Sequence, residues 1–478
     1  MTTVNEQSRE YLKVAVILAV TILLVYGDVA FMGYTLSLAV DNEGVLVGTQ
    51  YGYTGRRAYS STVLDPLSTG GQIQPALQLI VQRLYSGHFP LWNPYQGTGV
   101  PLAADPTWST YFPTNLLYFI PNGYWDYVEL LKLWVAAMFS YLLLKRFGLS
   151  NAASMGGAFA YSLSGALIVN PFVPWTDIAI MTPALLLVVK RCIDNTSRQS
   201  LVLTSVVVSI TLLGAHIETL VIQFLFVGWF AIFEIITRQT GRIKSLFGLL
   251  SSVVLGLGVA AFFLLPVFEY LLGSAFAHGA GVGLQSLSTT GSPGINLNPA
   301  FYWVTLFVPY FFGFFQAYPY AGLRNVFFWD IFPGYVGTTV FFLSLLPLFL
   351  GSFRDPRMKY YWFFLVSEIL ILMKNFGVPP VNWIGYLPVL TFINWRYSSS
   401  ILAMSFAGAC AFGLESARRT SKRRAWVAVF VVAILIIAGL CASLASRNSH
   451  PQGWAGRDHI DLSHGNWRSA VMGWLGVR

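Results

Sequence analysis

Apolar stretches about as long as a lipid bilayer is thick recur along the chain, separated by short polar turns. A helix needs about 20 apolar residues to cross the hydrocarbon core. The pattern predicts eleven transmembrane helices, at residues 12–38, 127–147, 151–170, 176–193, 199–214, 217–237, 244–271, 331–350, 359–374, 398–416 and 425–446. The shorter apolar pieces 301–316 and 379–395 predict re-entrant or interfacial segments. We therefore expect an all-α polytopic membrane protein, with one integral membrane domain over 1–446 and a short extracytoplasmic tail over 447–478.

Charged residues are scarce and unevenly distributed. The 478 residues are 55% hydrophobic and 10% charged, whereas a soluble protein carries about 25% charged residues. Five basic clusters each follow an apolar stretch: Lys145/Arg146, Lys190/Arg191/Arg198, Arg238/Arg242/Lys244, Arg354/Arg357/Lys359 and Arg418/Arg419/Lys422/Arg423/Arg424. Cytoplasmic loops collect Lys and Arg, so the clusters predict a multi-pass protein of the cytoplasmic membrane with its N-terminus inside. Basic residues in cytoplasmic loops then explain the net charge of +9. We therefore expect membrane lipids as partners and no nucleic acid.

One long polar segment interrupts this pattern, the expected first extracytoplasmic loop at 41–126. Loops of this length in a compact protein are usually functional or disordered, and the many aromatic residues argue for order. Ile73, Leu77 and Ile80 recur at helical spacing and predict an amphipathic helix over 72–86. We expect this helix to lie flat in the outer interface with its apolar face toward lipid. The stretch 88–113 would then form an ordered roof over a site on the outer face.

Three sequence motifs occur in a characteristic combination. An Asp-Pro pair at 65–66 precedes the amphipathic helix, and GHFPLWNPYQGTGVPLAADP follows it at 87–106. Further along come LLGAHIET at 212–219 and LPVLTFINWRYSSS at 387–400. Through these motifs the chain resembles the bacterial YfhO-type membrane proteins over most of its length. Many of these relatives continue further after their last shared helix, so we expect the tail 447–478 to be shorter than theirs.

This resemblance implies a GT-C type glycosyltransferase, with a GT-C-like bundle of about eleven helices and a large ordered first extracytoplasmic loop. Such an enzyme transfers a sugar from a polyprenyl-phosphate-linked donor on the outer face of the membrane. The acceptor would be a polymer, lipid or protein of the cell envelope. The resemblance also implies an acidic residue of the first outer loop at the active site, and Asp65 matches the family's Asp.

Transfer from a lipid phosphate requires a base for the acceptor hydroxyl and positive charge for the departing phosphate. Asp65 and Asp105 are the candidate catalytic carboxylates. Each precedes a Pro, so the alternative for both is a turn-forming role. For Asp105 the turn is the better interpretation. Glu218, at the outer start of a helix, and His216 beside it are candidates for binding sugar or acceptor. The alternative for Glu218 is a plain acid at a positive helix terminus.

The donor phosphate has a candidate site at Arg396. The helix that follows presents its N-terminus to the same leaflet, and backbone N–H groups with an Arg favour an anion. The alternative is an Arg that reaches for lipid headgroups. Arg56 and Arg57 are further phosphate ligands, in a Gly- and Tyr-rich stretch that indicates an exposed strand.

Aromatic and amide side chains of the roof are candidates for contacting the sugar or the acceptor. They are His88, Trp92, Asn93 and Tyr95. The alternative is a structural role, in which the Pro-Leu-Trp-Asn-Pro run holds the roof rigid.

Other chemistries lack their motifs in this sequence. We find no metal motif, Walker loop or dinucleotide fingerprint, so we expect no cofactor besides the lipid-linked donor, and the requirement for a divalent metal stays open. A transporter or flippase of lipid-linked sugars or lipids is the alternative. It would carry ionisable residues deep within several helices, where Asp28, Lys132 and Glu269 are the few present. A non-catalytic scaffold is the third possibility.

Overall fold

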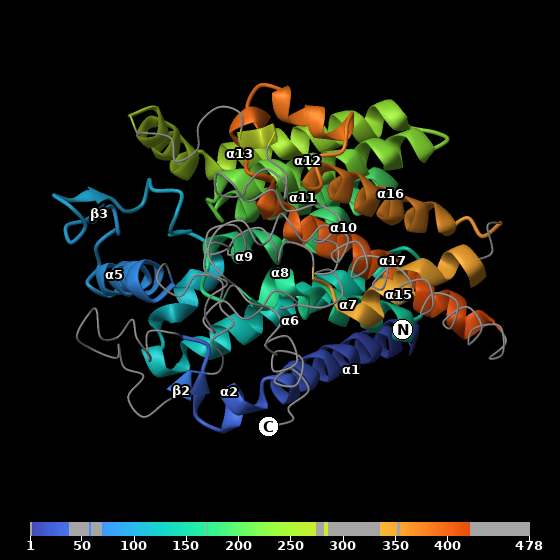
Figure 1. Cartoon of the computed structure of the whole chain (residues 1–478), viewed down its shortest axis with the longest axis horizontal. Coiled ribbons are helices and arrows are strands. Elements are labelled where there is room, and N and C mark those ends of the chain that lie inside the picture. Colours follow the sequence, from blue (N-terminus) through green and yellow to red (C-terminus); the bar gives the residue numbers. More distant parts are fainter. Residues whose placement is uncertain are drawn as a thin grey trace, which may run out of the picture.

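The computed structural model describes residues 2–37, 57–58, 69–169, 171–273, 282–284, 335–350 and 354–420. Helices occupy ten of the eleven expected transmembrane positions, and the eleventh, 425–446, lies outside the described residues. These helices are α1 (Thr2–Val25) with α2 (Gly27–Phe31), α6 (Trp125–Arg146), α7 (Asn151–Ser162) with α8 (Gly165–Ile168), α9 (Pro174–Ala179) with α10 (Thr182–Asp194), α11 (Arg198–Leu212), α12 (Ile217–Thr237), α13 (Arg242–Gly273), α15 (Thr338–Leu350), α16 (Met358–Asn375) and α17 (Ser399–Arg419). They form a single bundle whose long helices run in roughly one direction (Figure 1).

Four described segments are long and apolar enough to cross a membrane: Trp125–Arg146, Ile217–Thr237, Arg242–Gly273 and Trp395–Arg419. They make the chain an all-α membrane protein, while the total of eleven spans stays a prediction. The expectation of continuous helices over 151–170 and 176–193 is wrong, because each is broken into two shorter helices. In the second, Pro183 lies in the first turn of α10, and a Pro disfavours helical geometry in the residue before it.

The centre of the bundle is α17, which packs against α7, α15 and α16. Small residues on α17 permit this close packing. A Cβ atom added at Gly408 would lie 2.5 Å from the ring of Phe364, and one added at Gly413 would lie 1.8 Å from the carbonyl oxygen of Leu343. Small residues that let backbones approach are typical of helix interfaces in membranes.

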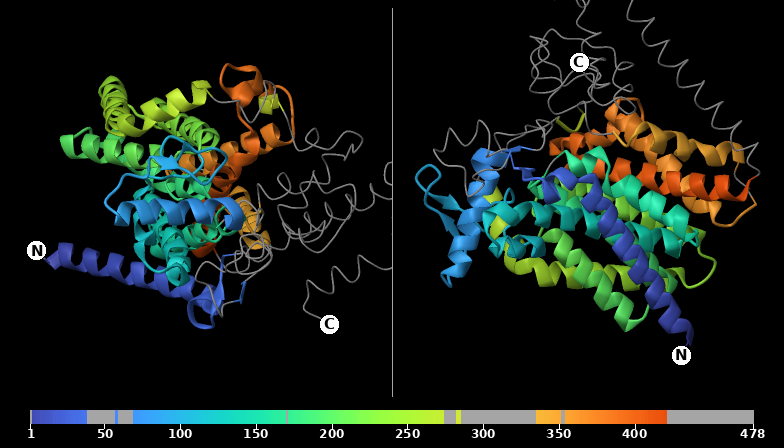
Figure 2. Two further views of the ribbon diagram at one scale, coloured as in Figure 1. Left: turned by 90° about the vertical axis from the view of Figure 1, so that its left-hand side faces the viewer. Right: turned by 90° about the horizontal axis from the view of Figure 1, so that it is seen from below.

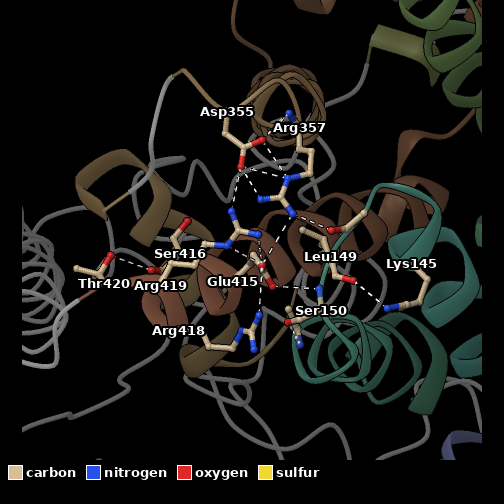
Figure 3. A network of polar contacts seen from close by, with 12 residues as sticks. Lys145, Leu149, Ser150, Asp355, Arg357, Glu415, Ser416, Arg418, Arg419 and Thr420 are labelled. Carbon is tan, nitrogen blue, oxygen red and sulfur yellow. Dashed lines mark hydrogen bonds and ion pairs between the residues drawn. The ribbon is translucent and has the colours of Figure 1, made fainter. Parts of the chain in front are cut away.

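Charged residues tie several turns together at one end of the bundle. Arg357 pairs with Asp355 and donates to the Gly148 carbonyl at 2.7 Å, while Arg419 pairs with Glu415 at 2.8 Å (Figure 3). Glu415 also accepts a hydrogen bond from the Ser150 N–H at 3.0 Å. The hydrogen bonds from Arg357 hold the pKa of Asp355 at about 2. The α6–α7 turn, the α15–α16 turn and the end of α17 are thereby joined.

The remaining basic clusters belong to the same end. Arg146 contacts Asp194 at 2.9 Å, and Lys190 contacts both Asp194 at 2.6 Å and Glu234 at 3.2 Å. The Arg238 guanidinium donates to the carbonyl oxygen of Ile193. The described members of all five clusters therefore share one side of the protein, as expected from their positions between successive apolar stretches. That this side faces the cytoplasm stays a prediction.

The opposite end carries the long loop. There α5 (Gln74–Tyr85) follows a π-helical turn, η2 (Thr69–Ile73), and confirms the amphipathic helix expected over 72–86. It crosses the end of the bundle next to the hairpin of β3 (Trp92–Asn93) and β4 (Val100–Pro101) (Figures 1 and 2). A second small sheet pairs β1 (Tyr34–Thr35) with β2 (Arg57–Ala58) in parallel.

The apolar face of α5 packs on protein, so the expectation that it faces lipid is wrong. Ile73, Leu77 and Ile80 are buried in one cluster with Trp108 and Trp125. The physical reason is that the loop supplies its own apolar partners, and a helix buries its apolar stripe against whichever such surface is nearest. We call this cluster the loop core.

Short 3-10 helices complete the same end. In the loop these are η3 (Pro113–Phe119) and η4 (Asn122–Tyr124), and η5 (Val282–Leu284) follows α13. The expected interfacial piece 379–395 contains η7 (Val381–Tyr386) and η8 (Leu390–Phe392), and η9 (Trp395–Ser398) leads into α17. This piece therefore forms no single continuous helix. The other expected piece, 301–316, lies outside the described residues.

Candidate functional site

Five half-buried side chains meet at the loop end of the bundle, and we call them the outer cluster: Trp175, His216, Glu218, Arg396 and Tyr397. The Tyr397 ring is the common neighbour of Trp175, His216 and Arg396. Its centroid lies 4.5 Å from that of His216 and 5.7 Å from that of Trp175. Cζ of Arg396 lies 4.9 Å from the same centroid, and Nη2 of Arg396 donates to the Tyr397 hydroxyl at 3.0 Å.

The turn between α11 and α12 positions His216 for local reasons. Gly214 packs tightly on α9, since a Cβ atom there would lie 2.5 Å from Cγ1 of Ile178. Ala215 has a left-handed backbone with φ of 68°, which non-glycine residues adopt uncommonly. His216 is the N-cap residue of α12, and its Nδ1 accepts a hydrogen bond from the Thr219 N–H at 3.4 Å. The small-His-x-Glu-Thr motif thus builds a tight turn and a helix cap.

Glu218 connects this turn to the Arg396 segment. Its Oε2 accepts a hydrogen bond from the Asn394 N–H at 3.3 Å, and the Asn394 side chain accepts one from the Arg396 N–H at 3.0 Å. Glu218 therefore holds the segment that presents Arg396. The structure brings together three residues predicted from sequence motifs that lie far apart in the chain.

The second half of the roof is docked onto the same elements. Oγ of Ser109 donates to the Gly214 carbonyl at 2.6 Å. The Tyr111 ring packs edge-on against Phe262 of α13, with centroids 5.3 Å apart. Trp175, a member of the outer cluster, also packs against the loop core. The loop and the outer cluster are consequently one connected unit.

Ser109 carries backbone strain within this contact. Its φ is 47°, and Phe172 in the loop core has φ of 66°. Together with Ala215, which precedes His216, they are three of the four non-glycine residues with left-handed backbone in the described part of the chain. Strained backbone of this kind is concentrated at functional sites.

The first half of the roof is the β3–β4 hairpin, which projects away from the helices (Figures 1 and 2). The Trp92 ring lies over Gly99, where a Cβ atom would approach it to 2.6 Å. Asn93 is buried and accepts a hydrogen bond from the Tyr95 N–H at 2.9 Å, which gives it a turn-forming contact. Trp92 is 50% exposed and Tyr95 83% exposed, and His88 is exposed as well. A shared pocket between this hairpin and Arg396 stays a prediction.

Of the two candidate catalytic carboxylates, the structure describes Asp105. Asp105 is buried, and its Oδ1 accepts a hydrogen bond from the Thr107 N–H at 2.8 Å. This contact fits the interpretation of Asp105 as a turn-forming residue. Its catalytic role stays a prediction. Asp65 and Arg56 lie outside the described residues. Arg57 is described through its backbone, which pairs with Tyr34 in the β1–β2 sheet.

A buried charged group adjoins the outer cluster and includes a residue that the sequence analysis missed. Lys132 of α6 lies 3.0 Å from Glu129 and 2.8 Å from Asp177 of α9. Its Nζ also donates to the Tyr118 hydroxyl at 3.1 Å. We call Glu129, Lys132 and Asp177 the buried triad. The signal for Asp177 was its position in an apolar stretch, where a charge is expensive unless paired.

The two groups are linked through α9, which carries both Trp175 and Asp177. The triad therefore fixes the short helix that presents one wall of the outer cluster. Nearby, Asp126 has a structural role, because its Oδ1 accepts hydrogen bonds from the Thr35 hydroxyl at 3.0 Å and the Leu36 N–H at 2.9 Å. Within the part of the chain that the structure describes, no group of three or more His, Cys, Asp or Glu side chains could hold a metal ion.

Comparison of the chain with models of protein families, with curated proteins and with solved structures finds no match. The functional interpretation therefore rests on the residues themselves and on the geometry above.

Proposed function

We propose that the protein is a glycosyltransferase of the cytoplasmic membrane, which transfers a sugar from a polyprenyl-phosphate-linked donor to a cell-envelope acceptor on the outer face. The observation that supports it is the outer cluster. Arg396, His216 and Glu218 come from two distant motifs and converge beside aromatic rings at the end of the bundle opposite the basic clusters. This is the arrangement that a lipid-anchored phosphate and a sugar require at a membrane surface.

The reaction assigns a role to each group. The bond between the anomeric carbon of the sugar and the phosphate oxygen breaks, and its electron pair leaves with the phosphate. Arg396 offsets the growing negative charge. The acceptor oxygen bonds to the anomeric carbon and passes its proton to a carboxylate, for which Asp65 is the candidate. Glu218 acts as a positioning residue, since it already holds the backbone of Asn394.

The experiment measures binding and turnover by the full chain in lipid nanodiscs. Loss of a charge-assisted contact to phosphate costs about 1.5–3 kcal/mol, so we expect Arg396→Ala to bind polyprenyl phosphate roughly ten- to a hundredfold more weakly. Arg396→Lys is expected to recover part of the loss, because an ammonium cannot make the bidentate contact. Turnover is followed as polyprenyl phosphate released from a panel of polyprenyl-phosphate sugars, with cell-envelope extract supplied as acceptor.

A matched control is Arg83→Ala, which removes a half-buried arginine from α5 at the same end of the bundle. It should leave both binding and release unchanged. Wild-type affinity in Arg396→Ala would make Arg396 a headgroup anchor and would move the phosphate site elsewhere. Absence of release from every donor would refute glycosyl transfer.

A transporter or flippase of lipid-linked sugars or lipids is the second candidate. The buried triad favours it, as does Glu368, which is 3% exposed in α16, because ionisable residues inside a membrane often mark a substrate or proton path. The discriminating assay uses liposomes with a fluorescent polyprenyl phosphate. Protein-dependent movement between leaflets without release of polyprenyl phosphate from any sugar donor would replace the first proposal by the second.

A further inference from the structure

The junction between the end of α16 and the start of α17 contains a buried cation that has no counter-ion in the described part of the chain. Lys374 is 1% exposed. Its Nζ donates to Oδ1 of Asn382 at 2.7 Å, and no carboxylate of the described residues forms a salt bridge with it. By contrast, the buried ammonium of Lys132 has two carboxylates within 3.0 Å. A buried charge is normally paired, so Lys374 requires an explanation.

A donor without a partner among the described residues lies next to this cation. Nζ of Lys374 is 5.1 Å from the centroid of the Trp395 ring. Trp395 is 8% exposed, and its indole N–H has no hydrogen-bond partner within the described ranges. Indole N–H groups usually find a partner when they are buried. Two adjacent donors without an anionic acceptor indicate that the acceptor is a ligand.

The same junction includes η9, which continues directly into α17, a helix of 21 residues. Ser398 occupies the N-cap position but makes no side-chain cap hydrogen bond. Its hydroxyl instead exchanges hydrogen bonds with the Asn375 side chain, at 3.2 and 3.3 Å, which fixes the end of α16 against the start of α17. The start of η9 is capped by Asn394, whose side chain accepts a hydrogen bond from the Arg396 N–H at 3.0 Å. The donors available to a ligand at this junction are therefore the side chains of Lys374 and Trp395.

We propose that Lys374 and the Trp395 N–H form a buried oxyanion site for a phosphate group. The site deepens the proposed function and rests on it in one respect, that the phosphate belongs to a lipid-linked donor. Arg396 follows Trp395 directly and contacts Tyr397. Two cations therefore lie close together: Lys374 beside the Trp395 ring, and Arg396 in η9 itself as part of the outer cluster.

The test is the binding of polyprenyl monophosphate to Lys374→Met in nanodiscs, with thermal stability measured in the absence of ligand. Methionine keeps the apolar stem and removes the charge. A ligand-binding Lys374 predicts at least a tenfold loss of affinity together with an unchanged or higher Tm, because an unpaired buried charge is removed. A structural Lys374, held by its contact with the Trp395 ring, predicts a lower Tm and unchanged affinity in the folded fraction, and this outcome overturns the proposal.

Two further variants sharpen the result. Trp395→Phe keeps a ring and removes the N–H, and we expect a several-fold loss of affinity without unfolding. Lys359→Met is the matched control, since Lys359 lies at the other end of α16 with its Nζ 4.8 Å from the Tyr360 ring. Its affinity for polyprenyl phosphate should equal that of the wild type. An equal loss in Lys359→Met and Lys374→Met would show a general effect on α16 and refute the site.

Competition with inorganic phosphate distinguishes the source of the group. Displacement of the lipid by inorganic phosphate, lost in Lys374→Met, identifies a site for the phosphate itself. Binding of the lipid alone, again lost in Lys374→Met, identifies a headgroup site entered from the membrane. Unchanged binding of both probes in Lys374→Met and Trp395→Phe overturns the proposal even if Arg396→Ala fails to bind. Conversely, Lys374-dependent binding without sugar release from any donor sustains the site and refutes only glycosyl transfer.

Discussion

Replacing Lys132 by Met tests whether the buried triad holds α9 in place. Its Nζ lies 3.0 Å from Glu129 and 2.8 Å from Asp177. At about 3 Å and an effective dielectric constant near 20, each contact contributes roughly 5 kcal/mol of attraction, most of which offsets the cost of desolvating the charges. Removing the cation alone leaves two carboxylates buried beside each other. We therefore expect Lys132→Met to lose about 3–5 kcal/mol of stability.

The assay is unfolding of the purified protein in detergent, combined with a double-mutant cycle. Lys132→Met with Asp177→Asn removes one charge of each sign, so the double variant should be less destabilised than the sum of the single ones. Lys145→Met is the matched control, because Lys145 lies at the other end of α6 and donates to the Leu149 carbonyl at 3.2 Å. A cost for Lys132→Met within about 1 kcal/mol of that control would refute the reasoning.

Three further predictions concern topology, the loop carboxylate and the charged network. In a cysteine-free background, Tyr95→Cys should react with an impermeant reagent in intact cells, because Tyr95 is 83% exposed on the β3–β4 hairpin, which we expect to lie outside. Labelling confined to inverted vesicles would reverse the orientation. Asp65→Asn should abolish sugar transfer at normal protein levels, since an amide cannot accept the acceptor's proton, and wild-type activity would move the catalytic role to Asp105. Arg357 lowers the pKa of Asp355 from 3.8 to about 2, so its stabilisation is present above about pH 4 and is lost as the pH falls toward 2. Thermal unfolding between pH 4 and pH 2 should show a loss of roughly 1–2 kcal/mol that is missing in Asp355→Asn.

Helix positions and the grouping of basic clusters could be read from the sequence because both follow from composition. An apolar run must be helical in a bilayer, and Lys and Arg collect on one side. The outer cluster could be read in part, since Arg396 and His216 each lie at the start of a predicted helix. What no pattern revealed is that Tyr397 lies between them, because the packing of η9 on α12 depends on contacts far apart in the chain.

The misses have identifiable physical causes. The prediction that the apolar face of α5 contacts lipid is wrong because the periodicity of a sequence reveals an apolar face but not the surface on which it packs. Asp177 was overlooked because hydropathy averages over a window, and one Asp does not cancel its apolar neighbours. Lys374 lies in the last turn of α16, and basic residues are common at the ends of membrane helices. The sequence therefore gives no reason to expect that Lys374 is buried beside Trp395.

The distribution of buried charge favours chemistry at one face over passage across the membrane. Lys132 lies seven residues into α6, about 10 Å along the helix at 1.5 Å per residue, so the triad belongs to the end that carries the loop. Lys374 and Glu218 lie at the same end. Between this end and the basic network runs α17, whose spanning segment is 89% buried and rich in small apolar residues. Glu368 lies at a similar depth, seven residues before the end of α16. A conduit needs polar groups at successive depths, whereas the buried ionisable residues of the described ranges lie toward the two ends of the bundle. A lipid-anchored phosphate could reach those at the loop end without crossing the bilayer.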